Sequence, residues 1–366
     1  MKVIISGGGT GGHIFPAIAI AQELKRRDSS IPILFIGANG KMEMEKVPQA
    51  GFEIKGLDVV GYNRSNILKN LLLPFKLAKS LGQAKSILKE FSPSIVVGVG
   101  GYASGPTLYM ANRMGIPTLI QEQNSYAGKT NKILAKKAKK ICVAYDGMNA
   151  FFDLDKIVLT GNPVRKDLIG LAGKKAEAIH YFGLSEHKKT VLVMGGSLGA
   201  NTLNQTMAFN MDTISKKDQV QWIWQYGKQG IGKFDDSNFT KPSHIKSMPF
   251  IDRVDLAFAA ADVVLCRAGA LTISELLIAN KPAVLVPAPY VAEDHQSHNA
   301  LALVEKGAAE MVKDNVATTE AIQRVYDLLD DEESIDKMKT AQASLAKPNA
   351  TESIVNEIFK LIPQAA

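Results

Sequence analysis

The sequence predicts an α/β protein with two doubly wound parallel sheets, each in a domain of its own. Three observations predict this fold class. Apolar, strand-like runs alternate with helical patterns along the chain, the alternation pauses at residues 161–163 and restarts, and a glycine-rich loop follows the first strand of each half. A length of 366 residues is sufficient for two domains with separate hydrophobic cores.

The individual elements follow from hydrophobic pattern and from turn-forming residues. Short runs rich in Val, Ile and Leu predict buried strands, and the longer amphipathic segments between them predict helices. The Gly-Asn-Pro sequence at 161–163 predicts a turn between the two halves. The predicted strands are residues 3–6, 33–36, 95–99, 118–121, 140–143, 157–160, 190–194, 221–225, 244–247, 263–266, 283–286 and 310–312. The predicted helices include residues 16–27, 71–91, 102–114, 272–279, 298–306, 319–329 and 351–361.

Composition limits the cellular setting that we expect. Hydrophobic residues make up 46% of the chain and charged residues 22%, which is ordinary for a soluble globular protein. No apolar run is long enough to span a bilayer, and the N-terminus enters a strand directly, unlike a signal peptide. The only cysteines, Cys142 and Cys266, are far apart in the sequence. We therefore expect a protein of the reducing cytoplasm without a disulfide framework.

Positive charge is concentrated in the first half of the chain. The first 165 residues hold 22 Lys and Arg against 11 Asp and Glu, whereas the rest holds 21 against 25. This excess indicates an anionic partner, for which a membrane surface, a nucleic acid and a phosphorylated substrate are alternatives. Residues 68–79 interleave Leu72 and Phe75 with Lys69 and Lys76, a pattern typical of docking on an anionic membrane. A helix packed on the protein's own core has the same periodicity.

Two glycine-rich loops have the features of anion-binding sites. GGGTGGH, residues 7–13, and GGSLGA, residues 195–200, each follow an apolar strand and precede a helix, whose N-terminal amides and dipole favour phosphate. The first loop also satisfies G-x-G-x-x-G. However, the second predicted strand ends in Ile36 and Gly-Ala-Asn, without the carboxylate that a dinucleotide site uses. We therefore favour a phosphate-like ligand in each half over NAD.

Three further features bear on chemistry. His13 lies beside the first loop, where a partly solvated imidazole can move a proton, although a lone histidine is more often structural. Glu275 falls one turn into a predicted helix, where it can cap the helix or bind a ribose diol. Residues 287–299 carry two acids and two histidines without a firm metal-ligand spacing, so their hydrogen-bonding side chains suit a sugar better than a metal.

Six motifs, in this order along the chain, closely resemble those of the MurG family, the peptidoglycan N-acetylglucosaminyltransferases of glycosyltransferase family 28. The motifs are GGGTGGHIFPAIAIA, VGVGGYASGP, QEQNSYAGKTNK, GNPVR, GGSLGA and CRAGALTISE. The resemblance implies a GT-B fold: Rossmann-like domains over 1–163 and 164–345 facing a cleft, and a helix in 346–366 returning to the first domain. It also implies an inverting hexosyltransferase that moves GlcNAc from UDP-GlcNAc to the C4 hydroxyl of MurNAc in undecaprenyl-pyrophosphoryl-MurNAc-pentapeptide (lipid I to lipid II).

The resemblance also implies roles for residues of this sequence. His13 is the candidate general base, and Asn124 and Arg165 complete the candidate catalytic set. For the acceptor diphosphate it implies Gly9, Thr10, Gly11, Gly101 and Tyr102. For UDP-GlcNAc it implies Thr10, Gly11, Gly12, Asn124, Arg165, Ser197, Ile251 (uracil), Ala270, Leu271, Thr272, Glu275 (ribose), Gln296 and Asn299 (GlcNAc hydroxyls).

Partners and location follow from the same resemblance. It implies UDP-GlcNAc and the lipid-linked acceptor as substrates, and peripheral docking on the anionic cytoplasmic face of the inner membrane through Lys69, Leu72, Phe75 and Lys76. Cell-wall synthesis or division proteins are the protein partners that this role suggests. Neither nucleic acid nor a required metal or other cofactor is implied, although a metal could stimulate the reaction. Two other functions stay open: a UDP-GlcNAc 2-epimerase, which shares the fold, and a non-catalytic UDP-sugar sensor.

Overall fold

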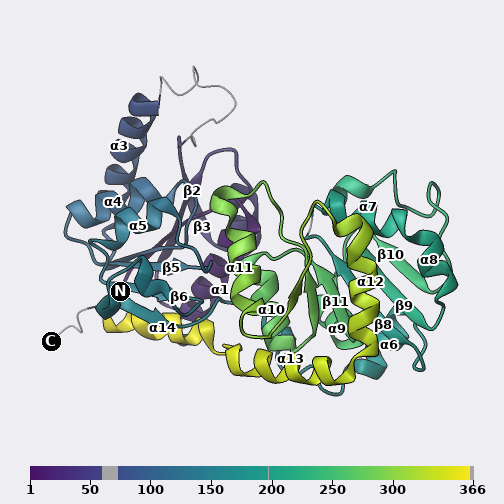
Figure 1. Ribbon diagram of the computed structural model, residues 1–366. Helices are drawn as coiled ribbons and strands as arrows, with labels where there is room; N and C mark the ends of the chain where they lie inside the picture. Colours follow the sequence, from purple (N-terminus) through teal and green to yellow (C-terminus); the bar gives the residue numbers. More distant parts are fainter. Residues whose placement is uncertain (60–72, 197, 363–366) are drawn as a thin grey trace. The chain divides into compact units, whose positions relative to one another are not determined.

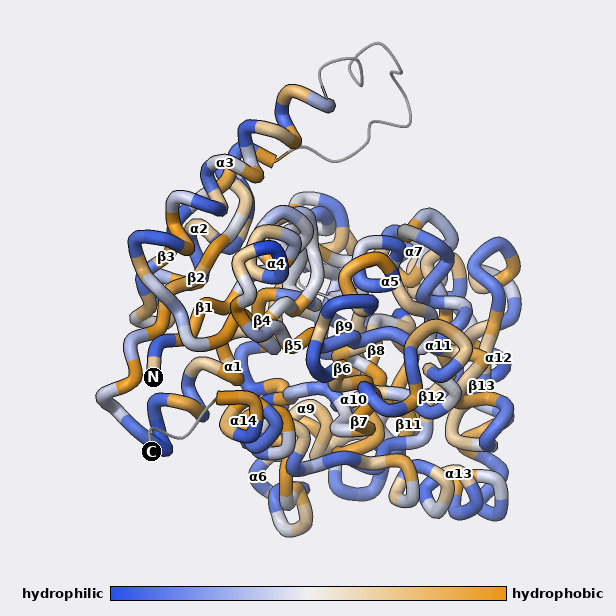
Figure 2. The backbone as a smooth tube through the Cα atoms, turned by 90° about the vertical axis from the view of Figure 1, so that its left-hand side faces the viewer, coloured by the Kyte–Doolittle hydropathy of each residue, from blue (hydrophilic) through white to orange (hydrophobic). Residues whose placement is uncertain are grey.

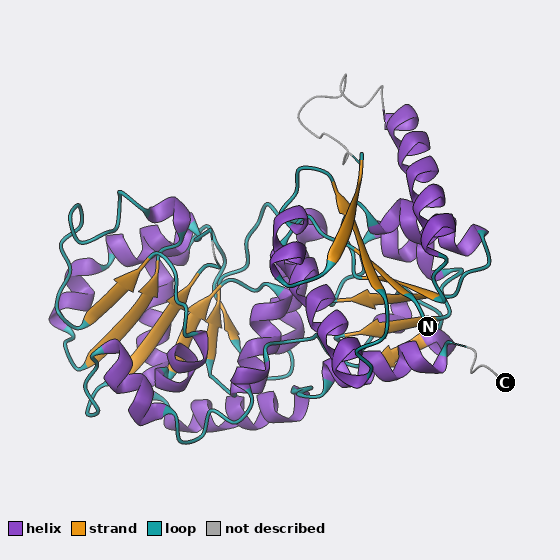
Figure 3. Ribbon diagram, turned by 180° about the vertical axis from the view of Figure 1, so that it is seen from behind, coloured by secondary structure: helices purple, strands orange, loops and turns teal. Residues whose placement is uncertain are grey.

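The computed structural model describes residues 1–59, 73–196 and 198–362, which form two compact units. Unit 1 comprises Met1–Val164 and Asn349–Ala366, and unit 2 comprises Arg165–Pro348. In each unit, helices cover both faces of a parallel sheet (Figures 1 and 3). The predicted α/β fold with two doubly wound sheets is therefore confirmed.

The sheet of unit 1 has the strand order β3-β2-β1-β4-β5-β6-β7 among the described residues, and every pairing in it is parallel. Its strands are β1 Val3–Ser6, β2 Ile33–Ala38, β3 Glu53–Leu57, β4 Ile95–Gly98, β5 Thr118–Glu122, β6 Lys140–Val143 and β7 Ile157–Leu159. Its helices are α1 Gly11–Arg27, α2 Glu43–Gln49, α3 Leu73–Phe91, α4 Ser104–Arg113, α5 Lys129–Ala135 and α14 Ala350–Lys360.

The central strands β1 and β4 of unit 1 are buried along their whole length, which is why three of the four residues in each are Val or Ile. One layer of the core includes α14, the last helix of the chain, which packs on α1 (Figure 1). Ile354, Val355 and Ile358 of α14 are fully buried there. The C-terminal helix thus belongs to unit 1. Sequence analysis missed the edge strand β3, in which only Leu57 is buried.

The sheet of unit 2 has the order β10-β9-β8-β11-β12-β13, again with parallel pairing. Trp222 and Trp224 of β9 are fully buried in its core. The strands are β8 Lys189–Met194, β9 Val220–Gln225, β10 Ile245–Met248, β11 Val263–Cys266, β12 Ala283–Leu285 and β13 Glu310–Met311. The helices are α6 Lys175–Phe182, α7 Asn201–Phe209, α8 Met211–Lys216, α9 Val254–Ala260, α10 Ala270–Ala279, α11 His295–Val304, α12 Ala317–Asp330 and α13 Glu332–Leu345.

In the part of the chain that the structure describes, no helix is long and apolar enough to cross a membrane.

Candidate active site

In each unit the strand order reverses beside the first strand, at β1 and β4 in unit 1 and at β8 and β11 in unit 2. Ligands of doubly wound sheets bind at this point, outside the carboxyl ends of the strands. The predicted glycine loops follow β1 and β8 at this edge of each sheet. We call the edge of each unit, with its glycine loop, a half-site.

In unit 1 the loop after β1 is packed against the loop after β4. The Gly8 N–H donates to the carbonyl of Gly100 at 3.2 Å. A Cβ on Gly101, whose φ is +86°, would overlap the backbone of Gly8, and Gly100 has a φ of +90°. Only glycine allows this close approach of the two backbones. The structure therefore brings the predicted acceptor residues Gly9 and Gly101 to one place.

His13 lies in the first turn of α1 with its ring turned back onto the loop. Its Nδ1 is 3.1 Å from the carbonyl oxygen of Gly8 and 3.3 Å from the hydroxyl of Thr10. Because a carbonyl oxygen can only accept, the contact with Gly8 assigns the proton to Nδ1 and leaves the lone pair on Nε2. The Nε2 edge of the ring lies over Gly100, where a Cβ would approach it to 2.8 Å.

The remaining predicted residues of unit 1 line the same edge. Thr10 is the exposed N-cap residue of α1, and Gly11 and Gly12 occupy its first turn, where backbone amides have no intrahelical acceptor. Tyr102 lies beside Gly101 and is 59% exposed. The glycine loop and these neighbours could be predicted from local sequence, because strand, glycine loop and helix follow one another directly along the chain.

Asn124 follows β5 and is held by the buried carboxylate of Glu122. Glu122 accepts the backbone and side-chain N–H groups of Asn124 at 3.2 and 3.3 Å, and the amide of Asn131 at 2.8 Å. Burial raises the pKa of Glu122, and these hydrogen bonds oppose the rise. The resemblance implies a role for Asn124 but names none for Glu122, whose carboxylate holds it.

In unit 2 the second glycine loop forms a tight turn between β8 and α7. The Gly199 N–H donates to the carbonyl of Gly196 at 2.9 Å, and a Cβ on Gly199 would overlap the carbonyl oxygen of Tyr226. Gln225, which sequence analysis missed, spans this edge: its amide N donates to Gly196 at 2.8 Å and its Oε1 accepts the N–H of Ile251 at 3.0 Å. Ser197 lies outside the described residues.

Arg165 and Glu275 come together although their motifs are far apart in the sequence. The guanidinium Nε of Arg165 is 3.4 Å from Oε1 of Glu275. Glu275 projects from α10, whose first residues are the predicted donor-loop residues Ala270, Leu271 and Thr272. Burial raises the pKa of Glu275 to about 7, although Arg165 opposes the rise.

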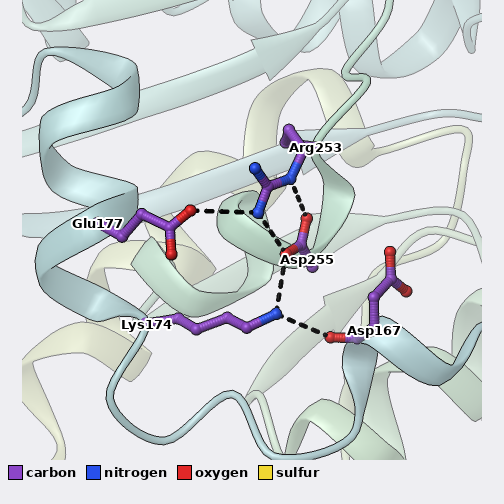
Figure 4. A network of polar contacts seen from close by, with 5 residues as sticks. All are labelled: Asp167, Lys174, Glu177, Arg253 and Asp255. Carbon is purple, nitrogen blue, oxygen red and sulfur yellow. Dashed lines mark hydrogen bonds and ion pairs between the residues drawn. The ribbon is translucent and has the colours of Figure 1, made fainter.

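An ion-pair network lies near the segment that carries Arg165 (Figure 4). Asp255 accepts from Arg253 at 2.9 Å and from Lys174 at 3.0 Å, and Lys174 also lies 3.4 Å from the carbonyl of Asp167. These bonds, those of Arg253 first, lower the pKa of the Asp255 carboxyl against the opposing effect of burial. The network joins α9, which follows Ile251, to the chain just after Arg165.

Gln296 and Asn299 lie on α11 and bind neighbouring loops. Gln296 accepts the N–H of Ala288 at 2.9 Å, and the fully buried Asn299 donates to the carbonyl of Ala268 at 3.4 Å. Arg267 adds a link that sequence analysis missed, since it donates to the carbonyl of Val286 at 3.0 Å and pairs with Asp314. The loops around the predicted donor residues are therefore joined by side-chain bonds.

The predicted membrane residues fall partly outside the description. Lys69 and Leu72 lie outside the described residues, whereas Phe75 and Lys76 lie on α3 and are exposed, Phe75 by 74%. Figure 2 shows orange and blue segments interleaved along α3, as the sequence predicted. Among the described residues, no three His, Cys, Asp or Glu side chains gather as metal ligands would.

Comparisons with known proteins cover the whole chain. The glycosyltransferase family 28 N-terminal domain matches residues 3–143, and the corresponding C-terminal domain matches residues 190–354. A protein of Parabacteroides distasonis is 52% identical over 99% of this chain and 98% of its own. A protein of Flavobacterium psychrophilum is 51% identical over 99% and 98%. Both are named UDP-N-acetylglucosamine–N-acetylmuramyl-(pentapeptide) pyrophosphoryl-undecaprenol N-acetylglucosamine transferase.

Solved structures agree with this match. The crystal structure of Acinetobacter baumannii MurG superposes with a TM-score of 0.77 at 29% identity, over 98% of this chain and 99% of that one. A UDP-GlcNAc 2-epimerase from Neisseria meningitidis has a TM-score of 0.66 at 15% identity, covering 98% and 100%, which is a likeness of fold alone.

Proposed function

The chain belongs to glycosyltransferase family 28, and we propose that it transfers GlcNAc from UDP-GlcNAc to the C4 hydroxyl of MurNAc in undecaprenyl-pyrophosphoryl-MurNAc-pentapeptide. Relatives that are 52% and 51% identical carry this donor and this acceptor in their names. The observation that carries the chemistry is the orientation of His13, whose Nδ1 bond to Gly8 leaves Nε2 as a base.

The transfer is a single in-line displacement that inverts the anomeric carbon. The C4 oxygen of the acceptor forms a bond to the anomeric carbon as Nε2 of His13 takes its proton. The bond from that carbon to the β-phosphate oxygen breaks, and UDP leaves with the electron pair. Arg165 and the N-terminal amides of α7 stabilise the negative charge that develops on the diphosphate.

The nucleotide of UDP-GlcNAc and the lipid-linked diphosphate use different units, and Thr10, Gly11, Gly12 and Asn124 of unit 1 stay among the residues that the resemblance implies for UDP-GlcNAc. The donor nucleotide occupies the half-site of unit 2, where Glu275 binds the ribose, Ile251 the uracil, and Gln296 and Asn299 the sugar hydroxyls. The lipid-linked diphosphate of the acceptor occupies the half-site of unit 1, at the N-terminal end of α1 and at Gly101. Asn124, held by Glu122, orients the acceptor hydroxyl toward His13.

Turnover tests the proposal directly. The protein is incubated with UDP-GlcNAc and a soluble analogue of the lipid-linked acceptor, and UDP and disaccharide are measured. We expect both products in equal amounts. UDP-ManNAc or ManNAc formed without acceptor would indicate an epimerase instead, and UDP-GlcNAc binding without turnover would indicate a sensor.

We further propose that unit 1 docks on the cytoplasmic face of an anionic membrane. Support comes from α3, where Phe75 is 74% and Leu77 54% exposed beside Lys76, and from Ile133 of α5, which is 67% exposed next to exposed lysines. Apolar side chains ringed by cations bind such surfaces by insertion and by charge together. The docked protein could then bind its undecaprenol-linked acceptor at the membrane surface.

Vesicle sedimentation separates the contribution of apolar insertion from that of electrostatic attraction. Changing Phe75 and Leu77 to serine should release the protein from vesicles with anionic lipid, and high salt should weaken binding of the unchanged protein. Phe209→Ser is the matched control, because Phe209 is 67% exposed but lies on α7 of unit 2. Binding that is lost equally in the control, or kept in the double variant, would contradict docking through α3.

The proposed chemistry requires no metal, because Arg165 and helix N-termini carry the charge of the leaving group. We expect turnover to persist in excess EDTA. A loss that Mg²⁺ restores would show that a metal is needed.

A further inference from the structure

Glu43 is a buried carboxylate that the proposed chemistry does not use. It is the first residue of α2 and is 1% exposed. Its Oε2 accepts the N–H of Gly9 at 2.8 Å, and its Oε1 accepts the N–H of Ala38 at 2.9 Å. A single carboxylate thus joins the glycine loop to the end of β2.

The surrounding backbone is shaped around this carboxylate. A Cβ on Gly8 would overlap the carboxylate of Glu43, and a Cβ on Gly37 would lie 2.5 Å from its Cγ. Burying a carboxylate costs several kcal/mol unless hydrogen bonds compensate for the lost water, which the two amides do here. A side chain that only filled space would not need two glycines and two amide bonds.

The Gly8–Gly9 peptide links Glu43 to His13. In a trans peptide the C=O and N–H groups point to opposite sides. Here the N–H of Gly9 points to Glu43, and the C=O of Gly8, in the same peptide group, accepts from Nδ1 of His13 at 3.1 Å. Rotation of this peptide would therefore break the bonds at both ends together.

Charge strengthens this chain of bonds. A hydrogen bond to a carboxylate is stronger than one between neutral groups, and it polarises the peptide so that the carbonyl becomes a better acceptor. The carbonyl of Gly8 then holds the Nδ1 proton of His13 more firmly.

We infer that Glu43 is a positioning residue for His13, which it orients through the Gly8–Gly9 peptide so that Nε2 carries the lone pair. The inference rests on the proposed role of His13 as the base. Glu43 is 1% exposed and acts here through its bonds to the backbone. Glu43 orients the histidine through one peptide group. The carboxylate of a catalytic triad also orients a histidine, but through a direct hydrogen bond.

Glu43→Gln tests this coupling with little change in shape. The amide can accept only one of the two N–H groups, because its NH₂ faces the other, so the peptide loses its fixed orientation. We expect kcat to fall about 10- to 100-fold, with the KM for UDP-GlcNAc within about 2-fold of the unchanged protein. Glu43→Asp keeps the charge but shortens the side chain, and should retain more activity than Glu43→Gln.

Glu23→Gln is the matched control for the loss of a buried carboxylate. Glu23 is 2% exposed on α1 and pairs with Arg26 and Arg27, away from the loop. It should lower the melting temperature without a selective loss of kcat. An equal loss of kcat in the control, or unchanged kcat in Glu43→Gln, would overturn the inference.

The ¹⁵N NMR spectrum of the His13 ring gives a readout that does not depend on turnover. The unchanged protein should show the Nδ1–H tautomer at neutral pH, and Glu43→Gln should show a mixture of tautomers. A dominant Nε2–H tautomer in the unchanged protein would overturn the coupling even if no variant folds. By contrast, full activity in a His13 variant would overturn the proposed base and leave the tautomer result standing.

Discussion

The guanidinium Nε of Arg165 lies 3.4 Å from Oε1 of Glu275, within unit 2. The side chain of Arg165 is 44% exposed, whereas that of Glu275 is 14% exposed. Water therefore screens the arginine, and burial of the carboxyl outweighs its attraction. The result is a ribose-binding candidate whose pKa is raised to about 7.

Binding of UDP-GlcNAc should depend on pH through Glu275. Below its pKa of about 7 the carboxyl group is protonated and accepts hydrogen bonds from a ribose diol less well. Above this pKa the carboxylate can accept hydrogen bonds from both ribose hydroxyl groups. Affinity should rise with pH through this range, and fall by up to about tenfold per unit on the acid side. Calorimetric titration with UDP-GlcNAc from about pH 5.5 to about pH 8.5 measures this dependence. Glu275→Gln should bind more weakly at high pH and with a flat profile, and an unchanged slope would contradict the assignment.

His13→Gln should reduce the chemical step without reducing donor binding. Glutamine can keep a hydrogen bond in the loop but cannot take a proton, so kcat should fall about 10²- to 10⁴-fold. The KM for UDP-GlcNAc should change little, because the nucleotide is proposed to bind through residues of unit 2, such as Glu275 and Ile251. Steady-state kinetics with both substrates checks this. His187→Gln, at an exposed position of unit 2, is the control and should retain full activity.

Much of the fold could be predicted from local sequence, because buried parallel strands are apolar throughout. β1 and β8 contain the apolar runs Val-Ile-Ile and Val-Leu-Val-Met, and both glycine loops follow them directly. β3 escaped prediction because it is an edge strand with one buried residue, Leu57, so its composition resembles that of a loop.

The site was less predictable where tertiary contacts define it. The sequence has no carboxylate at the end of β2, yet the carboxylate of Glu43, on α2, accepts the N–H of Ala38 there. It binds backbone and so differs from the ribose acid of a dinucleotide site. Gln225 likewise has no local signal, since its role comes from the distance between Gly196 and Ile251 across the sheet edge.

Gly101→Ala should damage unit 1 much more than an ordinary glycine substitution. The new Cβ would overlap the backbone of Gly8, and a φ of +86° is itself unfavourable for alanine. Backbone cannot yield as a side chain can, so we expect a loss of more than about 2 kcal/mol of stability and most of the activity. Gly115→Ala, with a φ of +74° and nothing within 4 Å, isolates the conformational cost of about 1 kcal/mol. Thermal unfolding and turnover distinguish the two. Equal effects would show that the loops do not depend on this contact.

Ile354→Ala should destabilise unit 1 from the far end of the chain. Ile354 is fully buried between α14 and α1, so the truncation removes apolar contacts and leaves a cavity, at a cost of about 2–5 kcal/mol. The control is Asn356→Ala on the exposed face of the same helix, where loss of the 2.6 Å bond from Arg27 should cost less than about 1.5 kcal/mol. Urea unfolding measures both. UDP-GlcNAc binding at about 25 °C should stay unchanged in Ile354→Ala, because the proposed nucleotide site lies in unit 2. A large loss of donor affinity in this variant would mean that the integrity of unit 1 governs the donor site as well.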